Sequence, residues 1–255
     1  MIEEDQGIDI AVDAFPTGYA FINVIRGASF KVLQHGVALE TCSYLAGPGT
    51  THFSLKMTHI QRALTIQLQP FALPFIFNRP AHCFAHEQLS LKDVNPEIAE
   101  RLEALVQGDT NTHMVLRACE EVILNYCTQT LIDPRAHHGL EQILGQGGQQ
   151  PIKSLSADLN LSQRRLQQLF SHYFGLSPKA LSRIVKMQYH SFQLLNGLSM
   201  EQIIPDGYFD QSHFIHELKK QTGRLPGEYE AYISAPERKV AYYTSNLYFK
   251  SESLR

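Results

Sequence analysis

The sequence predicts an α+β protein with a β-rich, barrel- or sandwich-like N-terminal part, helices that follow it, and an all-α C-terminal part. Short β-branched and aromatic segments fill the chain up to residue 70, helical periodicity begins near residue 96, and one helical pattern occurs twice after residue 150. Residues 1–150 hold 9 Lys+Arg and 16 Asp+Glu, whereas residues 151–255 hold 13 and 9. Charge balances of −7 and +4 indicate two parts with different roles.

The N-terminal part contains short segments that are partly alternating in polarity. Glycine and proline separate them, as at Gly27, Gly36 and the sequence GPG at 47–49. Such strands, too short to bury a face alone, are typical of a small barrel or sandwich. The predicted strands are 19–25, 28–34, 37–47, 51–57 and 63–70.

Two helices are predicted next. Residues 96–108 begin with proline, end with glycine and carry apolar residues at helical spacing. Residues 111–131 carry an apolar seam that either packs on the β-rich part or forms a dimer contact, and its length does not decide between these. Around 132–150 the sequence becomes loop-like, which predicts a domain boundary there. The seam consists of Val115, Cys119, Val122 and Tyr126.

The repeated pattern has a constant offset of 48 residues. Each copy reads as a helix, a glycine that ends it and a proline that starts the next helix. Two helical units with the same construction are therefore expected. The matched pairs are Leu166 and Phe214, Phe170 and Leu218, Gly175 and Gly223, Pro178 and Pro226, and Leu181 and Tyr229.

The first copy has the pattern of a helix-turn-helix motif. Residues 152–161 predict a short helix and a turn, and Ser162 is a good N-cap for the next helix. That helix has one apolar stripe and a second face with Arg164, Gln167, Gln168 and Ser171. Arginine pairs with guanine and glutamine with adenine, although a polar helical face is more often merely solvated. The second copy favours the DNA-binding interpretation.

The two copies resemble the double helix-turn-helix domain of AraC-family transcription regulators. The resemblance covers residues 136–234 and rests on SQRRLQQLFSHYFGLSPKALSRIVKMQ and GYFDQSHFIHELKKQTGRLPGEY. It implies an effector-sensing or dimerising domain at 1–131, a DNA-binding domain at 132–234 and a tail at 235–255. The implied partners are double-stranded DNA, a small-molecule effector, a second copy of the chain and RNA polymerase. An alternative is a small β-barrel enzyme fused to a helical domain that no longer binds DNA.

The resemblance also implies roles for individual side chains. In the first motif the base-reading face falls on Arg164, Gln167 and Gln168, and in the second on Gln211, Ser212, His213 and His216. Phosphate contacts fall on Arg165, Arg183, Lys186, Lys219 and Lys220, although exposed lysines are often only solvated.

The sequence departs from the family in both motifs, and more so in the second. A basic residue is usual where this chain has Gln168 and His216, and Ile204, Pro205 and Asp206 make the turn before Gly207 one residue short. Residues 151–197 hold 6 Lys+Arg against 1 Asp, whereas 198–234 hold 3 against 6 Asp+Glu. The first motif is therefore predicted to dominate DNA binding.

No catalytic residue, cofactor or metal site is predicted. His82 and His86 have the spacing of a helical metal pair, but a site needs three or four ligands. His35, His52 and His59 lack the close cluster of metal-binding β-barrels. The cysteines, which contain no CxxC pair, are predicted to be reduced packing residues, and the absence of a signal peptide or apolar span predicts a cytoplasmic protein. These cysteines are Cys42, Cys83, Cys119 and Cys127.

Overall fold

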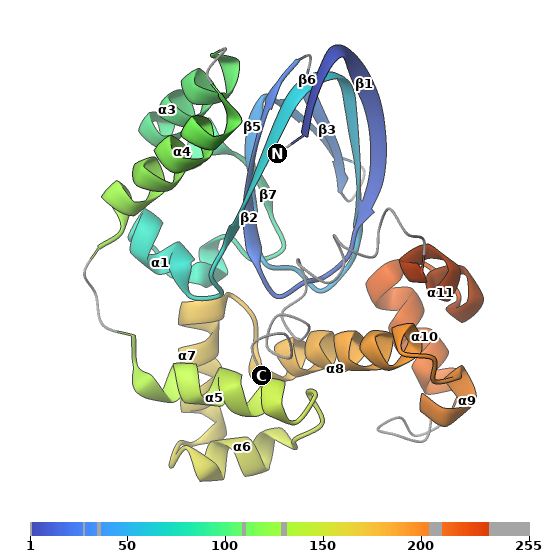
Figure 1. The fold of residues 1–255 in the computed structure, drawn as a ribbon. Helices are drawn as coiled ribbons and strands as arrows, with labels where there is room; N and C mark the ends of the chain where they lie inside the picture. The colour runs from blue at the N-terminus through green and yellow to red at the C-terminus, as the bar shows by residue number, and fades with distance from the viewer. Residues whose placement is uncertain are drawn as a thin grey trace.

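The computed structural model describes residues 2–27, 29–34, 37–108, 111–128, 132–203 and 211–234. Within them, a curved antiparallel sheet stands above a layer of helices, as Figure 1 shows. The predicted α+β class, with its β-rich first part and helical second part, is confirmed. The strands are β1 (Ile2–Ala14), β2 (Ala20–Arg26), β3 (Ser29–Gln34), β4 (Val37–Thr41), β5 (Ser43–Ala46), β6 (Phe53–Leu68) and β7 (Gln88–Ser90).

Strand β6 organises the sheet, whose order is β4-β3-β6-β2-β5-β7. β1 pairs along residues 53–63 of β6, while β3 and then β2 pair along its other edge. The sequence predicted two strands here, at 51–57 and 63–70, and the predicted break is wrong. No glycine or proline lies between them; instead the ladder bulges at His59, which has a φ of 50° and donates its N–H to Asp9 Oδ1 at 2.9 Å.

The sequence prediction missed strand β1 altogether. Its signal was the alternation of Ile8, Ile10 and Val12, which the acidic residues before it obscured. The register shifts between Glu3 and Ile10 that accompany the bulge also interrupt a simple alternating pattern. The residues that follow β1 contact the helical part, since the Gln188 side chain donates to the carbonyl of Thr17 at 3.0 Å.

Helices α3 (Pro96–Gln107) and α4 (Thr112–Tyr126) cover one side of the sheet. Val115 and Val122 of α4 are buried in the same hydrophobic cluster as Leu102 of α3, and Tyr126 donates its hydroxyl to Glu97. The apolar seam therefore packs within the chain. Of the two alternatives for the seam, Val115 and Val122 follow the intramolecular one, and Tyr126 packs partly buried against the same cluster.

The loop predicted around 132–150 is largely a helix, α5 (Pro134–Gly145). Asp133 caps it by accepting the N–H of Arg135 at 3.0 Å, and proline occupies its first turn. Gly139, which suggested a loop, is needed inside the helix because a Cβ there would lie 3.0 Å from the ring of Phe170.

The repeated pattern predicted the remaining helices. In the first copy, α7 ends at Gly175, with a φ of 74°, and Pro178 starts the next helix. In the second, α10 ends before Gly223, with a φ of 72°, and Pro226 starts α11. These helices are α6 (Ile152–Asp158), α7 (Gln163–Phe174), α8 (Pro178–Leu195), α9 (Met200–Ile203), α10 (Gln211–Thr222) and α11 (Pro226–Ser234).

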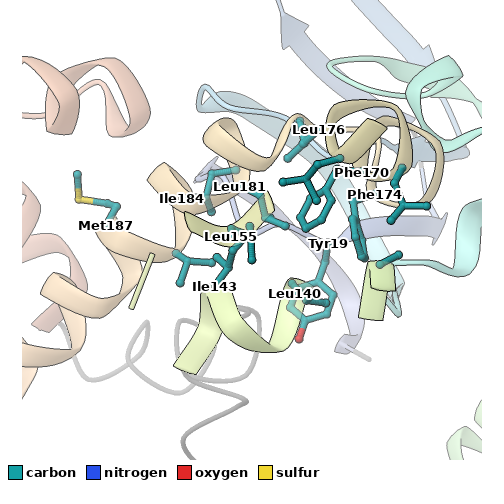
Figure 2. Close-up of a cluster of buried hydrophobic side chains, with 14 of the residues drawn as sticks. Tyr19, Leu140, Ile143, Leu155, Phe170, Phe174, Leu176, Leu181, Ile184 and Met187 are labelled. Carbon is teal, nitrogen blue, oxygen red and sulfur yellow. The ribbon is translucent and has the colours of Figure 1, made fainter. Parts of the chain in front are cut away.

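The helical part has its own hydrophobic core, which Figure 2 shows. Phe170, Leu155 and Leu140 of three helices meet there, and Phe214 and Leu218 of α10 belong to the same cluster. Tyr19, from the segment between β1 and β2, lies among them. The sheet part and the helical part therefore contact each other through this hydrophobic cluster. Burial raises the pKa of the Tyr19 hydroxyl to about 12.

Short elements complete the described fold. α1 (Ala72–Phe77), the 3-10 helix η1 (Ala81–Cys83) and α2 (Leu91–Val94) connect β6, β7 and α3. No helix in the described part of the chain is both long and apolar enough to cross a membrane.

Candidate nucleic-acid interface

Helix α7 presents the predicted base-reading face to solvent. The hydroxyl of Ser162 accepts the N–H of Arg165 at 3.2 Å and caps the helix, as its sequence predicted. Leu166 and Phe170 are fully buried, and this burial fixes which side of the helix faces the core. On its other side Arg164, Gln167 and Gln168 are exposed, with Ser171 half-buried beside them.

The short helix α6 completes the first helix-turn-helix unit. It packs against α7, and its Leu155 is fully buried in the shared core. Asn160, in the turn between the two helices, has a φ of 52°, which asparagine tolerates better than most residues. The turn thereby holds α7 across α6, as a recognition helix requires.

Helix α10 carries the corresponding side chains of the second unit. Phe214 and Leu218 are buried, so the opposite side of the helix faces solvent. Residues 204–210, which include Pro205 and Gly207 of the predicted short turn, lie outside the described residues. The exposed residues on α10 are Gln211, Ser212, His213, His216, Lys219 and Lys220.

Arg183 of helix α8 connects the two units. Its Nε lies 3.8 Å from Oε2 of Glu217 on α10, and its carbonyl accepts a bond from the Gln221 side chain at 3.4 Å. The side chain of Arg183 is 47 % exposed, so it can still reach a phosphate, but a carboxylate now shares its charge. Lys186, one turn further along α8, is only half-exposed.

Glu217 is the functional residue that the sequence reasoning missed. It lies next to His216 and is mostly buried, with a side-chain exposure of 13 %. The available signal was an acidic residue on a helix that is expected to contact DNA. Its ion pair with Arg183 links α10 to α8.

The histidine pair in the sequence PAHCFAH does not form a helical metal site. His82 lies in η1, whereas His86 follows it with a φ of 65°, so the two are not one turn apart on a helix. Among the residues that the structure describes, no group of three His, Cys, Asp or Glu side chains could hold a metal ion. His35 lies outside these residues.

The cysteines are free thiols, as expected. Cys119 is buried, and this burial raises its pKa to about 11. Cys42 and Cys83 are half-buried, which agrees with packing. Cys127 is exposed at the end of α4, so the packing prediction is wrong for this residue.

Comparisons with known proteins identify the helical part. A model of a helix-turn-helix domain matches residues 155–232, from α6 into α11. No curated protein matches the chain. Among solved structures, ToxT from Vibrio cholerae is 14 % identical, with a TM-score of 0.47 over 89 % of this chain and 98 % of that one.

Two further solved structures show the same weak likeness. Wild-type ToxT from Vibrio cholerae with a bound unsaturated fatty acid is 14 % identical, with a TM-score of 0.45 over 90 % of this chain and 96 % of that one. The AraC-like transcriptional activator CuxR is 15 % identical, with a TM-score of 0.31 over 71 % and 73 %. At such low TM-scores the assignment rests on the helix-turn-helix match.

Proposed function

We propose that this chain, whose residues 155–232 match a helix-turn-helix domain, is a transcription regulator of the AraC family that reads DNA mainly through helix α7. Residues 132–234 bind double-stranded DNA, and residues 1–131 sense an effector and form a dimer, with 235–255 as a tail. The protein acts in the cytoplasm, with RNA polymerase as a further partner where it activates transcription.

The observation that carries the proposal is the division of α7 into two faces. Arg164, Gln167 and Gln168 are exposed on one face, while Leu166 and Phe170 fix the other in the core. A recognition helix needs this combination, because its side chains must reach base edges from a rigid backbone. Arginine and glutamine side chains can each form two hydrogen bonds to one base.

Phosphate contacts would come from the residues that flank this face. Arg165 follows Arg164 on the exposed side of α7, and Arg183 and Lys186 lie on α8. These cations would set the position of the helix without reading sequence. Lys219 and Lys220 in the last turn of α10 would add weaker contacts from the second unit.

A mobility-shift experiment with DNA from beside the coding region tests the proposal. The wild-type chain should shift this DNA more strongly than a scrambled duplex, and Arg164→Ala should reduce that preference. Arg101→Ala, an exposed arginine on α3, is the matched control and should leave the shift unchanged. An enzyme with an inactive helical domain would shift neither duplex.

A second copy of the chain fits the outer face of α4. Met114 and Leu124 are 62 % and 60 % exposed there, and Arg117 and Glu121 lie between them, also exposed. These positions are symmetric about residue 119. An antiparallel pair of α4 helices would therefore place Met114 against Leu124 and Arg117 against Glu121 twice, which is the self-complementarity that a two-fold interface needs.

A further inference from the structure

An open cleft of about 450 Å³ lies where helix α7 meets η1 of the sheet part. The two elements are in close contact, since a Cβ on Gly175 would lie 2.9 Å from the carbonyl oxygen of Ala81. The volume falls within the range of small-molecule sites, roughly 300 to 1,000 Å³. The cleft is lined by His82, Asp133, Arg165, Gln168, Leu169, Ser171, His172 and Tyr173.

The only carboxylate in this lining is already satisfied. Asp133 accepts two side-chain bonds from Arg135, at 2.7 and 3.0 Å, and caps helix α5. The Arg135 hydrogen bonds are the main reason why the pKa of Asp133 lies below its usual range. Its negative charge is therefore compensated within the protein.

The other polar groups of the lining can all donate hydrogen bonds, and Arg165 is the one among them that cannot also accept. Arg165 offers its guanidinium group, which no hydrogen bond or salt bridge joins to another side chain in the described part of the chain, although its charge also helps to lower the pKa of Asp133. Gln168 and Ser171 add an amide and a hydroxyl beside it. The lining also includes the imidazole of His82, from the sheet part, and the apolar side chain of Leu169.

We propose that this cleft binds a small organic anion with two or more carboxylate or phosphate oxygens. The planar guanidinium group of Arg165 matches such a group with two parallel hydrogen bonds. A second anionic group of the ligand reaches His82, which comes from η1 of the sheet part. The ligand would thereby bridge the sheet part and the helix-turn-helix part.

The position of the cleft gives this ligand a regulatory role, which rests on the proposed DNA-binding function. Gln168 and Ser171 belong to the exposed face of α7 and also line the cleft, and Arg165 is an expected phosphate contact. An anion on these side chains competes with DNA for them. Arg164 and Gln167 lie on the same exposed face but do not line the cleft.

Calorimetry without DNA tests the site itself. Citrate and inorganic phosphate are titrated into the full chain at constant ionic strength, with sodium chloride as the blank. Citrate should bind, and Arg165→Ala should weaken it by about tenfold or more because the two-bond contact is lost. Arg164→Ala, on the same helix outside the cleft, should change the affinity by less than about twofold. Binding of phosphate as tightly as citrate would assign the site to a single phosphate group.

The DNA experiment tests the regulatory role. Citrate should weaken DNA binding by the wild-type chain but not by His82→Ala, whose substitution lies outside the expected DNA contacts. Ionic strength is held constant because any salt weakens DNA binding. No citrate binding, or equal losses for Arg164→Ala and Arg165→Ala, would overturn the proposal. If citrate binds but the chain shifts no DNA in the mobility assay, the proposed function is refuted while the anion site stands.

Discussion

Arg224, just after helix α10, forms an ion pair with Asp13, near the end of strand β1, although 211 residues separate them. The guanidinium group of Arg224 also lies over the ring of Tyr232, 4.3 Å from its centroid, and the Tyr232 hydroxyl donates to the carbonyl of Asp13 at 3.3 Å. The second helix-turn-helix unit is therefore attached to the sheet. A displacement of β1 would be transmitted to this unit directly.

Phe15→Ala should loosen this attachment. The Phe15 ring lies 5.6 Å from that of Tyr229 and 5.1 Å from that of Tyr232, so truncation removes two aromatic contacts. Because Phe15 is only half-buried, the expected loss in the free energy of unfolding is about 1 to 3 kcal/mol, less than for a fully buried phenylalanine. Urea unfolding measures the loss, and hydrogen exchange should show faster exchange in α10 and α11.

The neighbouring acidic residues supply the controls for that experiment. Asp13→Asn should cost only up to about 1 kcal/mol, since the ion pair is partly exposed. Asp9→Asn, whose side chain is 60 % exposed beside His59, should leave exchange in α10 and α11 unchanged. Slower exchange in these helices after Phe15→Ala would contradict the attachment.

Glu217→Gln should strengthen DNA binding without regard to sequence. The substitution removes the carboxylate that lies 3.8 Å from Arg183 and frees the arginine for a phosphate. Affinity for cognate and scrambled duplexes should rise equally, and the slope of log affinity against log salt should steepen by up to about one. Salt titrations of the mobility shift measure both. The double variant Glu217→Gln with Arg183→Ala should lose the gain; if it keeps the gain, Arg183 is not the phosphate contact.

The pairing of α4 helices can be tested by exchanging charges. Arg117→Glu places like charges opposite each other in the proposed antiparallel dimer and should weaken it. Arg117→Glu combined with Glu121→Arg restores both pairs and should restore the dimer. Sedimentation of the full chain at tens of micromolar gives the monomer and dimer populations of each variant. A dimer that survives Arg117→Glu, or a wild-type monomer, would exclude this face of α4.

Asp133→Ala should reduce stability at neutral pH, because α5 loses its N-cap, at a cost of about 0.5 to 2 kcal/mol. Asp133→Asn keeps a capping oxygen but lacks the charge. The pKa of Asp133 is lowered in the folded state, chiefly by the Arg135 hydrogen bonds, so its charge stabilises the fold above the ordinary aspartate pKa. This contribution is lost as the pH falls below about 4. Thermal unfolding between pH 3 and 7 should show a smaller acid loss for Asp133→Asn than for wild type; equal losses would contradict the assignment.

The helical repeat was predictable because its signals are local. Ser162 caps its own helix, Gly175 ends it, and Pro178 begins the next, so each boundary can be read within a few residues. The exposed face of α7 follows from the same periodicity. The sequence therefore predicted the helices that carry the candidate site more closely than it predicted the sheet.

The features that were missed depend on distant partners. Gly139 reads as a helix breaker until Phe170 packs against it, and β6 continues through a bulge at which His59 donates to Asp9 of the distant strand β1. The apolar seam of α4 could be read from the sequence, but only its packing with α3 shows that the seam is covered within the chain. Likewise, Glu217 acquires its role only from Arg183 on another helix. Periodicity identifies a face but not what covers it.

The two helix-turn-helix units should contribute unequally to DNA binding. Arg164→Ala alone should cost about 1 to 3 kcal/mol and relax the preference at one base pair, as a lost direct base contact does. Arg164→Ala with Gln167→Ala should cost several times more than Gln211→Ala with His216→Ala, for which the expected loss is under about 1 kcal/mol. Residues 198–234 hold 3 Lys+Arg against 6 Asp+Glu, so the second unit should attract phosphates less than the first. Because all four side chains are exposed, neither double variant should unfold the chain, and circular dichroism checks this. Titrations with cognate and scrambled duplexes give the two losses. Equal losses would show that α10 reads bases as fully as α7 despite its acidic surroundings.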